Sequence, residues 1–211
     1  MGVSAVENGG QDEQACTWDE YRSRRAKHVS WKTLQSKLVY ENPWFTLRED
    51  QVINPGGGHN VYGHILFKKK AVAIVPLDDA GNTWIVGQDR YTLGEYSWEV
   101  PMGASDEDEA PLETAHRELR EETGLAAANM TQIMRLHTSN SVTNEEGFVF
   151  VATQLSEGDT EFDEMEVLDI RKLPLAEVVA MIERGEMTDA ISVAAVLRVF
   201  TAQKTSRADT T

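Results

Sequence analysis

The segment from Gly103 to Leu125, GASDEDEAPLETAHRELREETGL, constrains the chemistry of this chain more than any other. Its apolar residues have helical spacing, and Glu118, Glu121 and Glu122 recur three and four residues apart, so they share one helix face. Like charges at this spacing repel by about 0.2–0.5 kcal/mol per pair. Either this acidic face is solvated, or it binds a hard divalent cation that reverses the repulsion.

The net charge of the 211-residue chain is −15, and this excess restricts its partners. It argues against binding to nucleic acid or to an anionic membrane, which both favour a basic surface. A phosphate-bearing substrate would therefore need local positive charge from arginines or metal ions. Cys16 is the only cysteine, which excludes an intramolecular disulfide and a cysteine-based zinc site, and we expect a cytoplasmic protein.

Residues 1–30 read as an N-terminal extension that we expect to be partly disordered, because residues 1–15 are polar, acidic and contain glycine. Trp18–Lys27 fits a short helix or an arm that packs on a partner. The extension lacks the layout of a signal peptide, and no apolar run approaches the length of a membrane span. The pattern changes at residue 31, and we expect a small antiparallel β subdomain over 31–67, with strands at Thr33–Tyr40, Trp44–Ile53 and Val61–Phe67.

Residues 68–203 mix strands and helices, which indicates an α/β or α+β domain followed by a tail at 204–211. The apolar run Ala71–Leu77 predicts a strand buried on both faces, with Thr83–Gln88 as its hairpin partner across a turn. Pro111 and Gly124 suit the two ends of the acidic helix. Further strands are expected at Tyr96–Val100, Gln132–Thr138, Gly147–Leu155 and Val167–Ile170, and two closing helices at Leu175–Arg184 and 189–203.

The acidic segment resembles the Nudix box, G-x5-E-x7-R-E-U-x-E-E-x-G-U, where U is aliphatic. Every position is filled, by Gly103, Glu109, Arg117, Glu118, Leu119, Glu121, Glu122, Gly124 and Leu125. The complete motif favours the metal-binding interpretation over a solvated helix face. The resemblance implies the Nudix fold, a mixed β-sheet sandwiched between helices, and a metal-dependent pyrophosphohydrolase.

The resemblance also assigns roles within the box. Glu118 and Glu122 are expected to be the main ligands of Mg²⁺, for which Mn²⁺ could substitute, with Glu121 as a further ligand or catalytic group. The backbone carbonyl of Met102 would complete the metal site. Arg117 would hold the glutamates in place by bidentate pairing. Carboxylate oxygens are hard ligands that suit Mg²⁺, and the bound ion can activate water and neutralise phosphoryl charge.

Two segments before the box resemble those of the ADP-ribose and nucleoside-diphosphate-sugar pyrophosphatase branch. QDRY at 88–91 is similar to its QYR segment, and WEVPMG at 98–103 is similar to WELPAG. Carried over, these make Arg90 and Glu99 substrate-binding residues. The early β strands fit as well, because such enzymes typically exchange a small antiparallel domain across a homodimer.

The family usually supplies one more carboxylate from a loop after the box, and residues 139–146, SNSVTNEE, occupy that place. Glu145 aligns best as the catalytic residue, with Glu146 as the alternative. The proline that marks ADP-ribose pyrophosphatases is missing, since Ser139–Ser141 reads SNS. GDP-mannose, dinucleotides and dinucleoside polyphosphates therefore remain alternative substrates. A capped RNA end is disfavoured by the acidic charge. A nucleotide-sensing regulator would usually show a degraded box, which this chain does not.

Overall fold

The computed structural model describes residues 30–106, 108–158 and 168–208. The prediction of a helix or arm at Trp18–Lys27 lies outside these residues, as does Val167. The chain divides into two compact units. The described part of one comprises residues 30–36 and 50–62, and that of the other comprises 37–49 and 63–208 with the stated gaps.

The first three strands form an antiparallel sheet in the order β1-β2-β3. β1 is Lys32–Glu41, β2 is Phe45–Ile53 and β3 is His59–Phe67. Asparagine side chains fix both turns between them. Oδ1 of Asn42 accepts hydrogen bonds from the backbone at Trp44 and Phe45, and Oδ1 of Asn54 accepts from Gly56 and Gly58. The three strands predicted in this region are confirmed.

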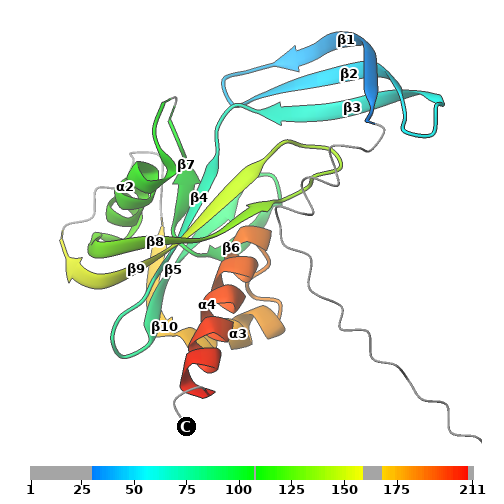
Figure 1. Ribbon diagram of the computed structural model, residues 1–211. Helices are drawn as coiled ribbons and strands as arrows, with labels where there is room; N and C mark the ends of the chain where they lie inside the picture. Colours follow the sequence, from blue (N-terminus) through cyan, green and yellow to red (C-terminus); the bar gives the residue numbers. More distant parts are fainter. Residues whose placement is uncertain (1–29, 107, 159–167, 209–211) are drawn as a thin grey trace, which may run out of the picture. The chain divides into compact units, whose positions relative to one another are not determined.

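The following residues build two further sheets (Figure 1). The larger has the order β7-β4-β9-β8, from Met102–Ala104, Ala71–Pro76, Glu146–Glu157 and Leu125–His137. The smaller has the order β10-β5-β6, from Asp169–Pro174, Asn82–Arg90 and Glu95–Glu99. β4 is parallel to β9 and antiparallel to β7, so the larger sheet is mixed.

The predicted hairpin between the strands at 71–77 and 83–88 is wrong. β7 and β9 occupy both edges of β4, so no edge is left for β5. A single bridge between Leu77 and Thr83 joins the two segments, and β5 pairs with β6 and β10 instead. The Asp78 carboxylate accepts hydrogen bonds from Ala80 and Asn82 and closes the turn between the sheets.

Other strand bounds also differ from the prediction. β7 was missed because three residues show no periodicity, and β8 begins at Leu125, immediately after the acidic helix. β10 continues past Ile170 to Pro174 because its backbone pairs with β5 from Asn82 to Gly87.

Helices cover the strands on two sides, α2 (Pro111–Thr123) on one and α3 (Leu175–Glu183) with α4 (Ala190–Ala208) on the other (Figure 1). The residues of β4 alternate between two cores. Val72 and Ile74 pack in a cluster with Leu119 of α2, whereas Ala73 and Val75 pack in the cluster that contains α3 and α4. The predicted α/β (α+β) class, with a mixed sheet between helices, is confirmed. None of the described helices is long and apolar enough to cross a membrane.

The two ends of α2 match the sequence prediction. Pro111 is the first residue, and the Glu113 carboxylate accepts a hydrogen bond of 3.1 Å from the backbone N–H of Ala110. Gly124 has a φ of 69°, and its N–H donates to the Arg120 carbonyl at 2.8 Å. This left-handed residue ends the helix and turns the chain into β8.

Candidate active site

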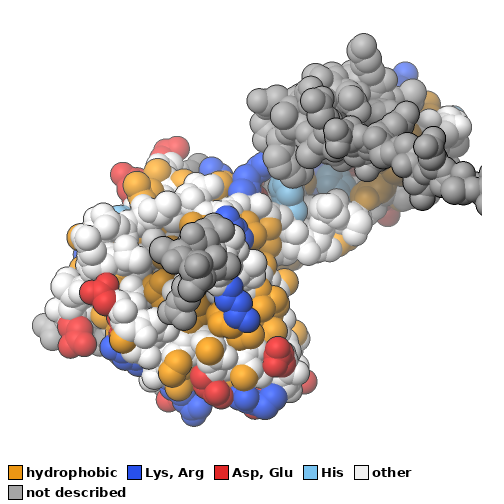
Figure 2. All heavy atoms as spheres, turned by 60° about the horizontal axis from the view of Figure 1, so that its bottom comes forward, with side chains coloured by type: hydrophobic (Ala, Val, Ile, Leu, Met, Phe, Trp, Pro, Cys, Tyr) orange, Lys and Arg blue, Asp and Glu red, His pale blue; other side chains and the backbone are white. Residues whose placement is uncertain are grey.

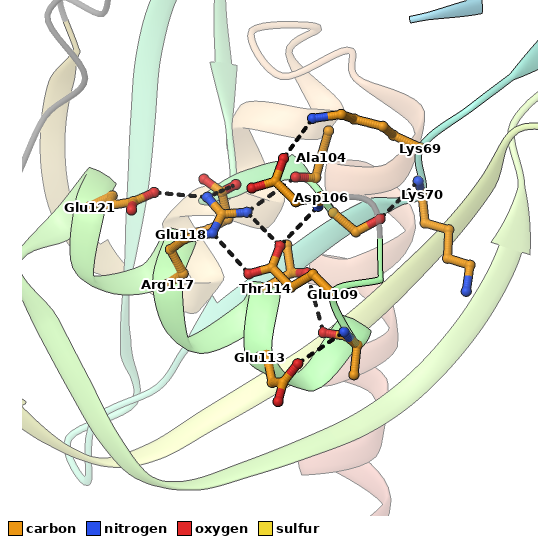
Figure 3. A network of polar contacts seen from close by, with 12 residues as sticks. Lys69, Lys70, Ala104, Asp106, Glu109, Glu113, Thr114, Arg117, Glu118 and Glu121 are labelled. Carbon is orange, nitrogen blue, oxygen red and sulfur yellow. Dashed lines mark hydrogen bonds and ion pairs between the residues drawn. The ribbon is translucent and has the colours of Figure 1, made fainter.

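Arg117 lies at the centre of a polar network at the acidic face of α2 (Figure 3). Its Nε and Nη2 donate to the two carboxylate oxygens of Glu109, each at 2.9 Å. Its Nη1 donates to Oε1 of Glu118 at 2.7 Å and to Oε2 of Glu121 at 2.9 Å. The arginine thus orients three carboxylates, and its bidentate partner is Glu109, which sequence analysis had left without a role.

This network changes the acidity of its members. The bidentate hydrogen bonds from Arg117 lower the pKa of Glu109 to about 2. The hydrogen bonds to Glu109, together with the charge of Glu118, raise the pKa of Arg117. The guanidinium therefore stays protonated and Glu109 stays ionised at any pH near neutrality.

Glu118 and Glu122 lie against β7. The Met102 backbone N–H donates to Oε2 of Glu122 at 2.9 Å, and the exposed fraction of Glu122 is only 3%. A Cβ at position 103 would lie 2.0 Å from Oε1 of Glu118, so only glycine leaves room for that carboxylate. Gly103 thereby lets the strand approach the helix, which places the backbone of Met102 beside Glu122.

We tested whether this site suits the divalent cation that the sequence predicts. Within residues 30–106, 108–158 and 168–208, no group of three or more His, Cys, Asp or Glu side chains has a metal-holding arrangement. The donor chemistry nevertheless fits, because Glu118 and Glu122 are buried carboxylates on one helix face. Carboxylate oxygens are the hard ligands that divalent cations such as Mg²⁺ prefer.

A second polar pair, Arg90 and Glu99, lies at neighbouring strands of the smaller sheet. Nε of Arg90 donates to Oε1 of Glu99 at 2.8 Å, and Nη2 donates to Oε2. Glu99 is 3% exposed, whereas Arg90 is partly open to solvent. The hydrogen bond to Glu99 raises the pKa of Arg90, and the charges of Asp189 and Glu122 raise it further.

The pair opens into a cavity of about 460 Å³. Its lining is mostly polar and comes from three segments of the chain: Arg90, Thr92, Leu93, Ser97, Glu99, Thr188, Asp189 and Ala190. A larger cavity of about 530 Å³ lies elsewhere, against β8, β9 and α4, and Arg198 is its only charged lining residue. The smaller cavity is therefore the more polar of the two, and its charged lining groups are one guanidinium and two carboxylates.

Sequence analysis missed Asp189 and Ser192, which hold α4 at this cavity. Oδ2 of Asp189 accepts from the Ser192 backbone at 2.8 Å, and so caps α4. The Ser192 hydroxyl accepts from the buried Val100 N–H at 3.1 Å, which ties α4 to the chain just after Glu99. The available signal was an Asp three residues before a Ser at a helix start, and it is too common to indicate a site.

Glu145, at the end of the loop between β8 and β9, and Glu146, the first residue of β9, lie in different settings. The Thr138 hydroxyl donates to Oε2 of Glu145, whereas Glu146 forms an ion pair with Arg135 across the two strands. A Cβ at Gly147 would approach Ile191 of α4. Because side chains alternate along a strand, Glu146, the first residue of β9, faces away from α4.

The structure therefore brings the predicted residues together in two groups and one loop. Arg117, Glu118, Glu121, Glu122 and Met102 meet where α2 and β7 approach, which we term the α2–β7 corner. Arg90 and Glu99 meet at the cavity. Glu145 makes its own contacts within the loop.

Comparison with known proteins agrees with the resemblance to Nudix proteins found in the sequence. The chain matches the NUDIX domain over residues 67–195 and the nucleoside diphosphate sugar hydrolase N-terminal domain over residues 31–65. The chain belongs to the Nudix family. The resemblance seen in the sequence is thus confirmed, and this Nudix protein is a pyrophosphohydrolase.

Two ADP-ribose pyrophosphatases are among the relatives whose sequences match most of this chain. That of Mycobacterium tuberculosis is 38% identical over 82% of this chain and 84% of its own length. That of Bacillus subtilis is 31% identical over 78% of this chain and 89% of its own. A solved structure of an ADP compounds hydrolase has a TM-score of 0.77 and 25% identity, covering 85% of this chain and 97% of that one.

Proposed function

We propose that this Nudix hydrolase cleaves the pyrophosphate bond of ADP-ribose or a related nucleoside diphosphate sugar, giving a nucleoside monophosphate and a sugar phosphate. The observation that carries the proposal is the α2–β7 corner, where buried Glu118 and Glu122 lie against a glycine-containing strand. The polar cavity beside Arg90 supplies a place for the substrate. The names of the relatives favour the ADP-ribose class.

Glu118 and Glu122 would hold Mg²⁺, or Mn²⁺ in its place, with Glu121 and the Met102 carbonyl as further ligands. When bound, the cation supplies charge neutralisation at the pyrophosphate and lowers the pKa of water. Arg117 keeps the carboxylates oriented through its hydrogen bonds to Glu118 and Glu121. This leaves proton transfer and substrate positioning to other residues.

Glu145 acts as the general base in this proposal, because it aligns best with the loop glutamate of the family and Glu146 is engaged by Arg135. A carboxylate needs only reach and ionisation to accept a proton from the attacking water. Arg90, which Glu99 holds by two hydrogen bonds, binds the phosphates. Glu99 fixes the orientation of the guanidinium and lies in the cavity lining.

A substrate panel tests this function. ADP-ribose, GDP-mannose, UDP-glucose, NADH and diadenosine polyphosphates are incubated with the protein and Mg²⁺ or Mn²⁺, and phosphomonoester products are identified by mass. We expect AMP and ribose 5-phosphate from ADP-ribose. GDP-mannose is the second candidate, because SNS at Ser139–Ser141 replaces the proline typical of ADP-ribose pyrophosphatases. No turnover of any of these compounds would contradict the proposal and favour a nucleotide-sensing role.

We also propose that the protein is a homodimer through its β1–β3 sheet. Every residue of β1 is exposed, and apolar side chains exposed in and beside the sheet include Trp31, Leu34, Leu38, Val39, Tyr40, Trp44 and Val61. Large exposed apolar surfaces mark interfaces, and a second copy of this sheet is the self-complementary occupant. Light scattering at micromolar concentration should give twice the chain mass of 23.6 kDa. A monomer would contradict the dimer.

The remaining expectations concern location and partners. A cytoplasmic location is proposed from the single cysteine and the acidic charge. The face in Figure 2 shows Lys and Arg side chains scattered among acidic and apolar ones, with no continuous basic band. The net charge of −15 supports a small nucleotide as substrate in place of RNA.

A further inference from the structure

We infer that Asn144 is a positioning residue for the reaction, because its side chain fastens the loop of Glu145 to the end of β3. The inference rests on the proposed function in one respect, namely that Glu145 is the loop carboxylate that acts as base.

The 138–145 loop leaves the sheet between two paired residues, His137 and Glu146. Within the loop, the Ser139 carbonyl accepts hydrogen bonds from the backbone of Val142 and Thr143, at 3.1 and 2.9 Å. These bonds give the tip of the loop a turn of its own. They do not fix the angle at which this turn leaves the sheet, so the loop needs an external contact to hold Glu145 in one place.

The end of β3 supplies that contact. The Ile65 N–H donates to the Val142 carbonyl at 2.9 Å, and the Asn144 N–H donates to the Ile65 carbonyl at 3.3 Å. Ile65 and Thr143 thereby form a parallel bridge. The loop is thus fastened to a strand that is distant in sequence. Phe67 and Asn144, which form a hydrogen bond, are 77 residues apart along the chain.

The Asn144 side chain completes this fastening in a way that few residues can. Its Oδ1 accepts from the Phe67 N–H at 2.6 Å, and its Nδ2 donates to the Phe67 carbonyl at 3.3 Å. The amide therefore pairs with both backbone groups of one residue, as a neighbouring strand would. Aspartate could keep the acceptor but not the donor, and alanine would keep neither.

Glu145 follows Asn144 directly, so the fastening acts on its backbone. The Glu145 N–H donates to the Thr143 hydroxyl at 3.3 Å, and the Thr138 hydroxyl donates to its carboxylate. With both backbone and side chain held, the carboxylate has a defined direction. A catalytic group that is misplaced by about 1 Å can lose up to about 100-fold in rate. The contact at Phe67 therefore matters for turnover even though Phe67 is remote in sequence.

The test compares Asn144→Ala with Asn140→Ala, which alters an exposed asparagine of the same loop. We expect Asn144→Ala to lower kcat about tenfold with KM within about twofold of wild type, since the base is misplaced and the substrate cavity is untouched. Asn144→Asp should lose less, because the bond from Phe67 N–H is kept. Asn140→Ala should match wild type.

Hydrogen exchange gives a readout independent of activity. In Asn144→Ala, the Phe67 amide should exchange faster, while the amides of α2 keep their wild-type protection. The unfolding temperature should stay within about 3 °C of wild type, because the lost bonds are exposed. Unchanged exchange at Phe67 would contradict the fastening itself.

The double variant Asn144→Ala with Glu145→Gln decides whether Asn144 acts through Glu145. We expect Glu145→Gln to lose about 100-fold in kcat, and the double variant to stay within about threefold of it. Multiplied losses, or a wild-type kcat in Asn144→Ala alone, would overturn the inference while leaving the proposed function intact. Wild-type activity in Glu145→Gln would instead overturn the assignment of Glu145, and the inference with it.

Discussion

The α2–β7 corner and the 138–145 loop both present glutamates, but they hold them by contacts of different range. Arg117 reaches Glu118 and Glu121 at one and four residues along α2, and Glu122 bonds to Met102, 20 residues away. The loop of Glu145 depends on Phe67, 77 residues from Asn144. The contacts of Arg117 with Glu118 and Glu121 form whenever α2 forms, whereas the contact between Asn144 and Phe67 depends on the fold of the whole domain.

This difference bears on what each region does. The α2–β7 corner is a buried, multiply bonded arrangement in which a moving carboxylate would leave a charge unpaired. The loop is held mainly by hydrogen bonds at exposed positions, which open more readily. We therefore assign metal binding to α2, which is held rigidly. We assign proton transfer to the loop and substrate binding to the cavity. The following predictions test that division.

The largest effect is expected for Glu122→Gln. The neutral side chain keeps its volume but removes the charge that would hold the cation, so turnover of ADP-ribose should fall by about 1,000-fold or more with the fold retained. The matched control is Glu113→Gln on the same helix, since glutamine also serves at this capping position. Near-normal rates in Glu122→Gln would show that the metal site is placed wrongly.

The next effect is expected in the loop. Removing the base by Glu145→Gln should lower kcat about 100-fold at saturating substrate, whereas Glu146→Gln should retain wild-type kcat because its carboxylate pairs with Arg135. Steady-state kinetics of both variants distinguish the two. If Glu146→Gln were the impaired variant, the assignment of Glu145 as the base would be contradicted.

A smaller effect is expected at the cavity. Arg90→Lys keeps the positive charge but loses the bidentate geometry with Glu99, so KM for ADP-ribose should rise about tenfold with kcat changed less than threefold. Kinetics over a range of substrate concentrations measure both constants. A lower kcat at unchanged KM would assign Arg90 to the chemical step. It would contradict the separation of catalysis at the α2–β7 corner from substrate binding at the cavity.

The smallest effect concerns stability in acid. Because Arg117 lowers the pKa of Glu109 from 4.5 to about 2, the ionised carboxylate stabilises the fold above about pH 4.5. That contribution, about 1–2 kcal/mol after solvent screening, should be lost as the pH falls from about 4.5 to 2. Denaturant unfolding of Glu109→Gln and wild type should therefore converge in this window. A constant difference across it would contradict the pairing.

The range of contacts also explains how much the sequence could predict. The roles proposed for Arg117 and Glu118 rest on a pattern within one helix, which periodicity and the Nudix box reveal. Glu109 was visible as a motif position, but its pairing with Arg117 across eight residues emerged only from the structure. The strands β1, β2 and β3 were found because each has its own turn residues.

Features that depend on pairing between distant segments were not predictable. The hairpin of β4 with β5 was wrong because the competitors for the edges of β4, Gly147–Ala152 and Met102–Ala104, come much later in the chain. Asp189, Ser192 and Asn144 have ordinary local signals, and only the fold brings them near Arg90, Val100 and Phe67. The sequence therefore indicated the class of reaction, but it did not indicate which residues position the catalytic and substrate-binding groups.

The most direct test of the α2–β7 corner is Mn²⁺ binding followed by electron paramagnetic resonance, which needs no substrate. Wild type and Glu113→Gln should bind Mn²⁺ with the same affinity, and the double variant Glu118→Gln with Glu122→Gln should lose that binding while its unfolding transition remains cooperative. Unchanged Mn²⁺ affinity in the double variant would contradict the assignment of the metal site to α2.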